Sequence, residues 1–477
     1  MAWKALILAI LLSAAGPRAG VSYYAIVAEN GAMIGHGSHE VRQGRGGLET
    51  VARSEIRLQE LDQAETRITE ETISRQDEAG RTVWIGEYSQ TGRSWSRSEA
   101  RIAAGRAEIS YRTSAQRRTL SIPLPPEVRF DNGQGLLRGW DLAAAPRLEF
   151  EDFSLSAMAV ERVVIEAAPG AWPDAEGRIA VLRKRYEGRE LRSIARLLLD
   201  RDHRVLAIVQ PMFGTSITIR PTDRVSAHRP HPPYSVIRNA MVPSLFRIPA
   251  NALQGHIRYR FAYRDGISFD LPQTSEQRVA AAAPNEVSVD ICASCGPGLP
   301  ADGAARAEAL RPTAWLQSDH PRIRAIAAPF ARMNVPEARK MERLAVLVPR
   351  LMPRVDFAGH FSALDALSRR AGDCTESAVL LAALGRAARI PTRVVSGLVY
   401  SRERYHGVGN VFMPHSWVLA YVDGQWRSFD SALEHFDSTH IALTIGDGDA
   451  RSIAAANQLA SLLQWQSMTE VRARPGT

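Results

Sequence analysis

The sequence predicts an α+β fold in which an antiparallel β-rich region precedes a region of mixed helices and strands. From Tyr23 to about Arg220 the chain alternates short runs of β-forming residues with turn residues. After Leu310 the pattern becomes helical, and strand patterns return at Arg393. The 477 residues are 45% hydrophobic and 23% charged, which is typical of globular proteins, and the length favours more than one domain.

The N-terminal residues 1–19 have the order of a secretory signal peptide. Lys4 precedes the apolar run Ala5–Leu12, and small residues follow it, so we expect cleavage near residues 15–19. An uncleaved anchor is the alternative. No later run reaches the roughly 20 apolar residues that a membrane-spanning helix needs. We therefore predict a periplasmic or secreted protein without a stable transmembrane segment after cleavage.

The formal net charge of +8 does not indicate a nucleic-acid partner, because the basic residues form no long run. The partner that we expect is a peptide or protein of the cell envelope.

Residues 20–226 are expected to form a first domain, a curved antiparallel sheet or a sandwich. Asn30 and Gly31 mark a hairpin turn, and residues 216–220 alternate polar and apolar side chains, as in a sheet with one wet face. The further predicted strands are residues 22–28, 82–88, 108–111, 160–166 and 204–209. A linker rich in Pro and His, residues 227–234, follows, and we assign no function to His228 or His231.

A second β-rich segment, residues 235–300, contains the predicted strand Ile257–Tyr263 and ends near a pair of cysteines. Cys292 and Cys295 could form a local disulfide, a zinc half-site or a redox pair. We prefer the disulfide, because two more zinc ligands or a thioredoxin-like setting are missing from the sequence. Cys374 is then left as a free thiol.

Residues 310–470 are expected to form the domain that carries the chemistry. Helical patterns cover residues 318–332, 336–351 and 361–369. Asp373 and Glu376 form a capping-box pattern that places Cys374 in the first turn of a fourth helix. The positive end of a helix favours the thiolate that a nucleophilic cysteine requires, although the two acidic neighbours act partly against it.

Three strands are predicted after this helix, at residues 393–400, 415–422 and 425–430. Asp423 and Gly424 form a two-residue hairpin turn, and this turn fixes the register of the last two strands. If Val422 faces Gln425, Trp417 faces Asp430, and His415 lies one pleat further along on the same face. An imidazole and a carboxylate at such diagonal positions are close enough to pair.

These residues predict a cysteine nucleophile with a histidine base and an orienting carboxylate. Cys374 would attack a carbonyl, His415 would accept and return its proton, and Asp430 would fix the imidazole tautomer. The N–H of Cys374 could bind the oxyanion, whereas Trp315, Gln317 and His360 are interpreted as structural. We predict no cofactor and no metal site, and we interpret Glu434, His435, Asp437 and His440 as solvated or capping residues.

The sequence resembles the transglutaminase-like superfamily, which has a papain-like core with Cys at the start of a helix packed on a sheet that carries His and Asp. The resemblance covers about residues 310–470. It rests on linked blocks in the right order, at residues 372–376, 380, 383–387, 390–397, 415–417, 421, 424, 426 and 430. Leu419 and Ser431 depart from the common pattern, where many relatives have an acidic residue and a proline.

The resemblance implies an exported enzyme that transfers an acyl group from a peptide or side-chain amide through a thioester on Cys374. Water as acceptor would make it a protease or amidase, and an amine would make it a crosslinking transglutaminase. The alternative is a non-catalytic envelope protein that binds peptides or acts as a scaffold. A zinc site at Cys374, His415 and Asp430 is disfavoured, because metal-ligand pairs usually lie closer together in sequence.

Overall fold

The computed structural model describes residues 20–44, 46–60, 64–92, 94–170, 172–212, 215–355, 360–403 and 408–472. The predicted signal peptide, residues 1–19, lies outside the described residues. The chain forms two compact units, Met1–Val236 and Ile237–Thr477. In the described part of the chain, no helix has both the length and the apolar character needed to cross a membrane.

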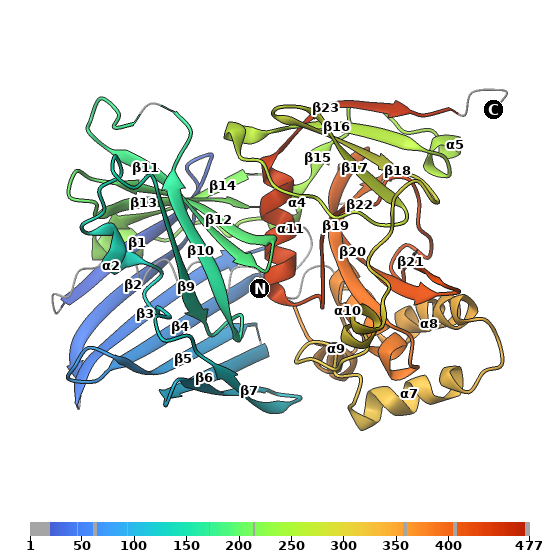
Figure 1. Cartoon of the computed structure of the whole chain (residues 1–477), viewed down its shortest axis with the longest axis horizontal. Coiled ribbons are helices and arrows are strands. Elements are labelled where there is room, and N and C mark those ends of the chain that lie inside the picture. Colours follow the sequence, from blue (N-terminus) through green and yellow to red (C-terminus); the bar gives the residue numbers. More distant parts are fainter. Residues whose placement is uncertain are drawn as a thin grey trace. The chain divides into compact units, whose positions relative to one another are not determined.

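The first unit is one antiparallel sheet in the order β8-β7-β6-β5-β4-β3-β2-β1-β14-β13-β12-β11-β10-β9 (Figure 1). Its strands are β1 (Gly20–Ala28), β2 (Met33–Gly44), β3 (Gly47–Leu58), β4 (Thr66–Gln76), β5 (Thr82–Thr91), β6 (Ser94–Ala103), β7 (Arg106–Thr113), β8 (Arg117–Pro123), β9 (Arg147–Ser154), β10 (Ala159–Ala167), β11 (Ile179–Glu187), β12 (Glu190–Leu199), β13 (Val205–Met212) and β14 (Thr215–Thr222). Of two short helices, α2 (Gln134–Leu137) lies between β8 and β9, and α3 (Arg224–Ala227) follows β14. The predicted antiparallel β-rich region is confirmed.

The sheet of the first unit curls back on itself. Ile85, Ala100 and Ile109, from β5, β6 and β7, form a buried cluster with Phe153 of β9 and Leu155, at the other end of the strand order. Apolar side chains on one face of a long twisted sheet can leave water only if that face meets another surface. Here the other end of the same sheet supplies that surface.

The second unit is built on two smaller sheets. The first has the order β15-β20-β19-β22, with β21 paired to β20, and the second has the order β17-β18-β16-β23. Their strands are β15 (Val242–Pro243), β16 (Ile257–Tyr263), β17 (Gln277–Ala283), β18 (Glu286–Ile291), β19 (Thr392–Ser401), β20 (Val411–Val422), β21 (Gln425–Phe429), β22 (Ile441–Gly446) and β23 (Leu463–Glu470). The predicted second β-rich segment therefore shares its sheets with strands from the end of the chain.

The helices of this unit are α4 (Val236–Ala240), α5 (Ala250–Leu253), η1 (Arg264–Gly266), α6 (Gly303–Glu308), α7 (Pro321–Ala331), α8 (Glu337–Leu351), α9 (Ala363–Arg369), α10 (Cys374–Ala387) and α11 (Ala450–Leu462). The predicted helices α7, α8 and α9 are confirmed, but each begins one to three residues later than expected. His320 and Ser362 lie before α7 and α9, where their side chains accept hydrogen bonds from backbone N–H groups of the first turn. Capping residues have non-helical backbone angles, so they precede the helix.

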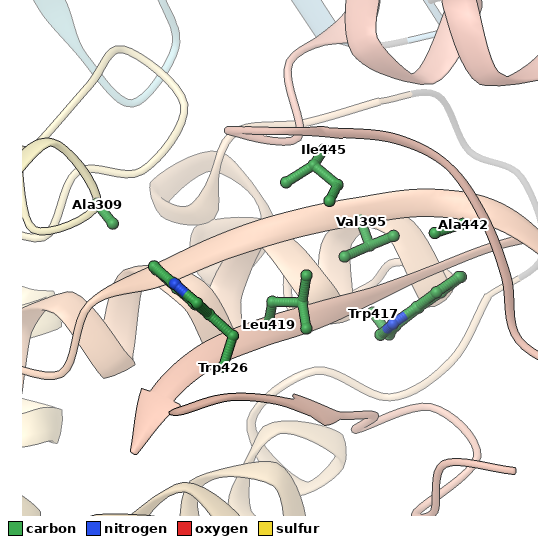
Figure 2. Packing of buried hydrophobic residues seen from close by; sticks show 7 residues of the cluster. All are labelled: Ala309, Val395, Trp417, Leu419, Trp426, Ala442 and Ile445. Carbon is green, nitrogen blue, oxygen red and sulfur yellow. The ribbon is translucent and has the colours of Figure 1, made fainter. Parts of the chain in front are cut away.

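The core of the first of these sheets is a buried cluster on β19, β20, β21 and β22. Figure 2 shows the indole rings of Trp417 and Trp426 on either side of Leu419. The full cluster is Ala309, Val395, Trp417, Leu419, Trp426, Ala442 and Ile445. Leu419, a departure from the family pattern, is therefore a core residue.

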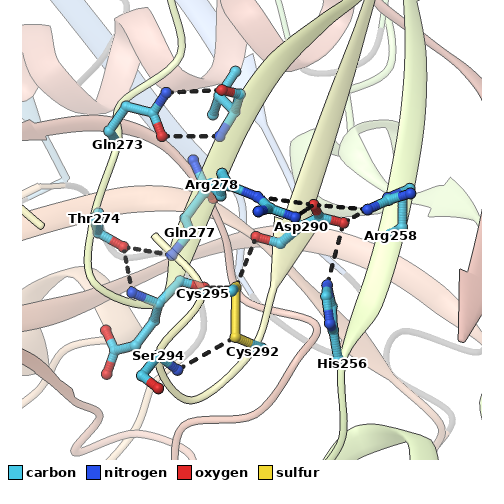
Figure 3. Close-up of a disulfide and its surroundings, with 12 residues drawn as sticks. His256, Arg258, Gln273, Thr274, Gln277, Arg278, Asp290, Cys292, Ser294 and Cys295 are labelled. Atoms are coloured by element: carbon cyan, nitrogen blue, oxygen red, sulfur yellow. Dashed lines mark hydrogen bonds and ion pairs between the residues drawn. A yellow bond between two sulfur atoms is a disulfide. The ribbon is translucent and has the colours of Figure 1, made fainter. Parts of the chain in front are cut away.

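Cys292 and Cys295 form a disulfide at the end of β18 (Figure 3). The preferred prediction of a local disulfide is confirmed, and Cys374 is the free cysteine. Beside the disulfide, Asp290 accepts hydrogen bonds from Arg258 and Arg278 at 2.7 Å each, on neighbouring strands β16 and β17. Burial alone would raise the pKa of Asp290, but hydrogen bonds from Arg258, Arg278 and His256 lower it to about 2. These ion pairs tie the three strands together.

Candidate active site

Cys374 is the first residue of α10, and a capping box holds this end of the helix. The carboxylate of Asp373 accepts the N–H of Thr375 at 2.8 Å, and the carboxylate of Glu376 accepts the N–H of Asp373 at 3.0 Å. The predicted capping box is confirmed. Glu376 also accepts the N–H of Phe361 at 3.0 Å, so the same buried carboxyl group anchors the chain before α9.

Gly372 is required by close packing just before the helix. A Cβ atom at this position would lie 2.5 Å from the Cβ atom of Glu376 and 2.8 Å from the sulfur of Met352. Any side chain would push Glu376 out of the capping box. The glycine of this sequence block therefore serves the placement of Cys374.

A gap in strand pairing lies on the outer edge of β20, next to Cys374. One edge of β20 pairs with β19. The other edge pairs with β15 at Val411 and Phe412 and with β21 from Val418 to Val422, and residues 413–417 lie between these two pairings. In this stretch the backbone N–H of Ser416 hydrogen-bonds to Cys374. The start of α10 therefore meets β20 beside His415.

The pKa of the Cys374 thiol is raised above its ordinary value, because burial and the negative charge of Asp373 disfavour the thiolate. The charge of Arg354 and the N–H of Ser416 act in the opposite direction but do not outweigh burial. This direction is the reverse of the one expected from the helix end alone. The cost of removing a thiolate from water exceeds the stabilisation that the helix end provides here.

His415 and Asp430 form a buried pair, with His415 Nε2 2.6 Å from Asp430 Oδ2. Val422 pairs with Gln425 as predicted, so the hairpin turn sets the register, and Asp430 follows directly after β21. The predicted proximity of the two side chains is confirmed. The N–H groups of Ala432 and Leu433 donate to the other carboxylate oxygen, at 2.7 and 3.1 Å, and hold its orientation.

The charge state of Asp430 fixes the tautomer of His415. Burial alone would raise the pKa of Asp430, but the two neighbouring histidines, His415 foremost, hold it far below its usual range. An ionised carboxylate only accepts hydrogen bonds, so Nε2 of His415 carries a proton. The other nitrogen, Nδ1, is buried and has no hydrogen-bond partner among the described residues.

His440 is a second histidine on the same carboxylate, and sequence reasoning missed it. Its Nε2 lies 3.2 Å from Asp430 Oδ2, and its Nδ1 lies 3.0 Å from Asp437 Oδ1. Burial would lower the pKa of His440, but hydrogen bonds to Asp430 and Asp437 raise it to about 9. Asp437 and His440 were interpreted as solvated or capping residues, and the solvated part was wrong, because both are buried. Asp437 does accept the N–H of Thr439 at 2.9 Å, as a capping residue would.

His435, in the same loop, differs from Asp437 and His440. His435 is exposed, and its Nδ1 lies 2.7 Å from the backbone oxygen of Leu433. No local pattern separates His440 from His435 in the sequence, since both are single histidines in a polar loop. The contacts with Asp430, Asp437 and Trp417, whose ring centroid lies 5.1 Å from that of His440, show that His440 belongs to the core.

A metal ion could also use this cluster. One ligand atom each from His415, Asp430 and His440 lies within 4.8 Å of the others, and all three residues are buried. In the hydrogen-bonded arrangement, however, both imidazoles approach the same carboxylate oxygen. A metal ion would have to replace the protons that now hold these contacts.

Gln317, Trp315 and His360, which were interpreted as structural, contact the chain around α9 and α10. The amide of Gln317 donates to the backbone oxygen of Ala314 and accepts the N–H of Leu364 at 3.1 Å. The backbone oxygen of Trp315 accepts the N–H of Ala363 at 2.9 Å. His360 is buried, with its Nδ1 3.9 Å from the carboxylate of Glu376.

Glu276 is a further buried carboxyl group that the sequence did not indicate. It accepts the N–H and the hydroxyl of Ser428, at 3.0 and 2.6 Å, and this hydroxyl accepts the indole N–H of Trp417 at 3.2 Å. Burial raises the pKa of Glu276. The second β-rich segment thus supports the hairpin that carries His415 and Asp430.

Residues 325–431 match the family model of the transglutaminase-like superfamily. The chain therefore contains a transglutaminase-like domain, and this segment includes Cys374, His415 and Asp430. The resemblance stated from the sequence is confirmed. None of the curated proteins compared with the chain matches it.

Solved structures show weaker likenesses. A "putative cysteine protease" from Cytophaga hutchinsonii is 17% identical, with 46% of this chain and 86% of that chain covered and a TM-score of 0.28. The periplasmic domain of TgpA from Pseudomonas aeruginosa, bound to ethylmercury, is 18% identical, with coverages of 48% and 84% and a TM-score of 0.28. A β-barrel-like protein of domain of unknown function DUF1849 from Brucella abortus is 14% identical, with coverages of 43% and 95% and a TM-score of 0.34. Because these scores are low, the assignment depends on the family model.

Proposed function

We propose that this protein is an exported cysteine enzyme that transfers an acyl group from a peptide or side-chain amide through a thioester on Cys374. We assign Cys374 as nucleophile, His415 as general base and acid, and Asp430 as the group that orients His415. Residues 1–19 would be the cleaved signal, so the enzyme would act on peptides or proteins in the periplasm or outside the cell.

One observation carries the proposal. His415 keeps Nδ1 buried and without a hydrogen-bond partner among the described residues, while Nε2 donates to Asp430. A buried ring nitrogen without a hydrogen-bond partner lowers the stability of the fold, because its lone pair has lost water and gained nothing in return. Such a group is retained more readily where it has a chemical role. Ser416, the residue after His415, hydrogen-bonds to Cys374, so we infer that this nitrogen accepts the proton of the Cys374 thiol.

The reaction would proceed in two displacements. The sulfur of Cys374 bonds to the amide carbon while its proton moves to Nδ1 of His415, and the carbonyl oxygen becomes an oxyanion near the N–H of Cys374. The C–N bond then breaks, and the departing amine takes the proton from His415. In the second half, His415 accepts a proton from water or from an amine, which attacks the thioester carbon. The C–S bond then breaks, and the departing sulfur takes the proton back from His415, which restores the thiol of Cys374.

The raised pKa of the Cys374 thiol favours proton transfer during the attack over a thiolate formed beforehand. The raised pKa also favours the alternative function, a scaffold that binds envelope peptides without reacting. A buried thiol of high pKa is ordinarily inert. The two functions therefore differ in how strongly His415 activates Cys374.

Alkylation of Cys374 separates these functions, because it is the free cysteine of the chain. The folded protein is treated with iodoacetamide at pH 7 and the labelled fraction is measured by mass spectrometry over time. We expect Cys374 to be labelled in the folded protein, and a rate at least tenfold lower in His415→Gln, because His415 would take the proton of the thiol during the attack. His435→Gln is the matched control, since His435 is an exposed histidine of the nearby loop and should not change the rate.

A thiol whose labelling rate does not respond to His415→Gln would support the scaffold. The acceptor is tested separately by incubating the protein with amide-containing envelope peptides, with and without a primary amine. Peptide-bond hydrolysis gives two fragments whose masses sum to the peptide plus one water, side-chain amide hydrolysis replaces NH2 by OH, and incorporation of the amine indicates crosslinking activity. Cys374→Ala should abolish both products.

A further inference from the structure

The outer face of the β-rich unit carries a groove lined mainly by arginines. The groove has a volume of about 570 Å³ and crosses β4, β5, β6, β7 and β8, which are drawn in blue shades in Figure 1. Its lining residues are Ile73, Arg75, Trp84, Arg97, Glu99, Arg101, Glu108, Ile109, Ser110, Arg112, Arg117 and Thr119. This lining belongs to the first unit, far in sequence from the proposed catalytic residues.

The strand register explains why the surface is hollow. Ile73, Gly86, Glu99, Ser110 and Thr119 face one another in one row across β4, β5, β6, β7 and β8. These side chains are mostly small, so the row forms a floor. Because neighbouring strands lie about 4.8 Å apart, a row across five strands is roughly 19 Å long.

Longer side chains flank the floor on both sides. The register places Arg75, Trp84, Arg101 and Glu108 in the row on one side. It places Arg97, Arg112 and Arg117 in the row on the other side. Each row lies two residues from the floor along the strands, so the two arginine rows stand roughly 13 Å apart, as the strand rise requires.

The groove has a surplus of positive charge. The lining contains five arginines and two glutamates. Arg97 already pairs with Glu99 at 2.6 Å, and Glu108 accepts the hydroxyl of Ser121 and lies 3.7 Å from Arg106. Within the described residues, the guanidinium groups of Arg101, Arg112 and Arg117 have no ion-pair or hydrogen-bond partner in this structure. These three groups stand on both sides of the floor.

We infer that this groove binds an extended acidic polypeptide segment. In an extended chain, successive side chains point to opposite sides, so neighbouring carboxylates can reach the two arginine rows at once. The planar guanidinium group matches a carboxylate with two parallel hydrogen bonds. About six extended residues span the length of the floor, where Ser110 and Thr119 offer hydroxyl groups to the peptide backbone.

The aromatic residue of the lining favours a peptide over an anionic polysaccharide. Sugar recognition commonly uses an open aromatic face, but the Trp84 ring lies against Gly86, where a Cβ atom would be only 2.3 Å from it. The guanidinium carbon of Arg75 lies over the ring, 4.5 Å from its centroid. Trp84 therefore supports the groove and does not offer a stacking surface to a sugar.

The binding test uses fluorescein-labelled octaglutamate and the full chain with Cys374→Ala, so that no chemistry at the other unit affects the result. Fluorescence anisotropy at 0.15 M salt should show saturable binding, and octaglutamine should not bind. The triple variant Arg101→Gln, Arg112→Gln, Arg117→Gln should weaken binding at least tenfold. The control triple Arg81→Gln, Arg204→Gln, Arg472→Gln removes the same charge from exposed sites, whose side chains are 80%, 74% and 81% exposed, and should change binding less than twofold.

Thermal melts of both triple variants establish that each one is folded. Absence of octaglutamate binding, or equal weakening by the two triple variants, overturns the inference. An oligogalacturonate or a single-stranded oligonucleotide of equal charge that binds more tightly than octaglutamate also overturns it, in favour of a glycan or nucleic-acid groove. Failure of the proposed enzyme activity leaves this result unaffected, since binding is measured on a chain that lacks Cys374.

Discussion

At the scale of single residues, the site depends on one carboxylate that accepts four hydrogen bonds. Asp430 accepts from His415 and His440 on one oxygen and from the N–H groups of Ala432 and Leu433 on the other. A buried carboxylate with every lone pair occupied has little freedom to rotate. His440 and Asp437 therefore complete the shell that holds Asp430 against His415.

We predict that His440 acts as a positioning residue. His440→Phe removes a donor to Asp430 and should lower kcat about 100-fold, the usual effect of misplacing a catalytic group by an ångström, with little change in KM. His440→Gln retains a donor and should recover part of kcat. Steady-state kinetics on a peptide substrate measure both variants. A change in KM alone, or equal losses in both variants, would contradict this role.

At the scale of the elements, local signals account for the transglutaminase-like segment. The capping box begins α10, and positive φ angles of 50° at Asp423 and 87° at Gly424 match the hairpin turn that joins β20 and β21. These signals involve residues at most three positions apart. The partners that sequence reasoning missed, His440 and Glu276, approach from other segments, and no short-range pattern indicates such contacts.

One strand of the β-rich unit is expected to be sensitive to acid. His39 of β2 is 2% exposed, and neither ring nitrogen has a hydrogen-bond partner in the described structure. Burial lowers its pKa from 6.5 to about 4. Between these two pH values, His39 is therefore protonated in the unfolded chain and neutral in the folded unit. Stability is complete above pH 6.5 and falls as the pH decreases to 4, by up to about 3 kcal/mol.

His39→Leu should remove this loss. Urea denaturation at pH 7, 5.5 and 4, followed by circular dichroism, should show a smaller decrease in the free energy of unfolding for the variant than for the wild type. His228→Leu, at an exposed histidine of the same unit, is the control. An identical acid response in His39→Leu and the wild type would show that His39 is not the group responsible.

At the scale of the whole molecule, the two proposed sites lie in different compact units. Residues 237–477 contain the disulfide, the transglutaminase-like segment and the proposed catalytic residues, whereas the arginine groove belongs to residues 1–236. Strands β15 and β16 pair with β20 and β23, so the second β-rich segment is part of the unit that holds Cys374. We interpret this segment as support for that unit.

This division predicts that residues 236–477 fold without residues 20–235. We expect a single cooperative thermal transition for this fragment, within a few degrees of one transition of the full chain, because units with separate cores unfold independently. Iodoacetamide should label Cys374 at the same rate in the fragment and the full chain. A fragment without a cooperative transition would show that the β-rich unit is needed for folding.

Residue spacing alone was sufficient to predict the β-rich half, the helices before Cys374, and the pairing of His415 with Asp430. Each depends on a repeat, a cap or a tight turn that constrains neighbours along the chain. The folded molecule was needed to identify His440, the high pKa of the Cys374 thiol and the arginine groove. These depend on burial and on which distant strands stand side by side, and the energy of removing a group from water is set by all of its surroundings at once.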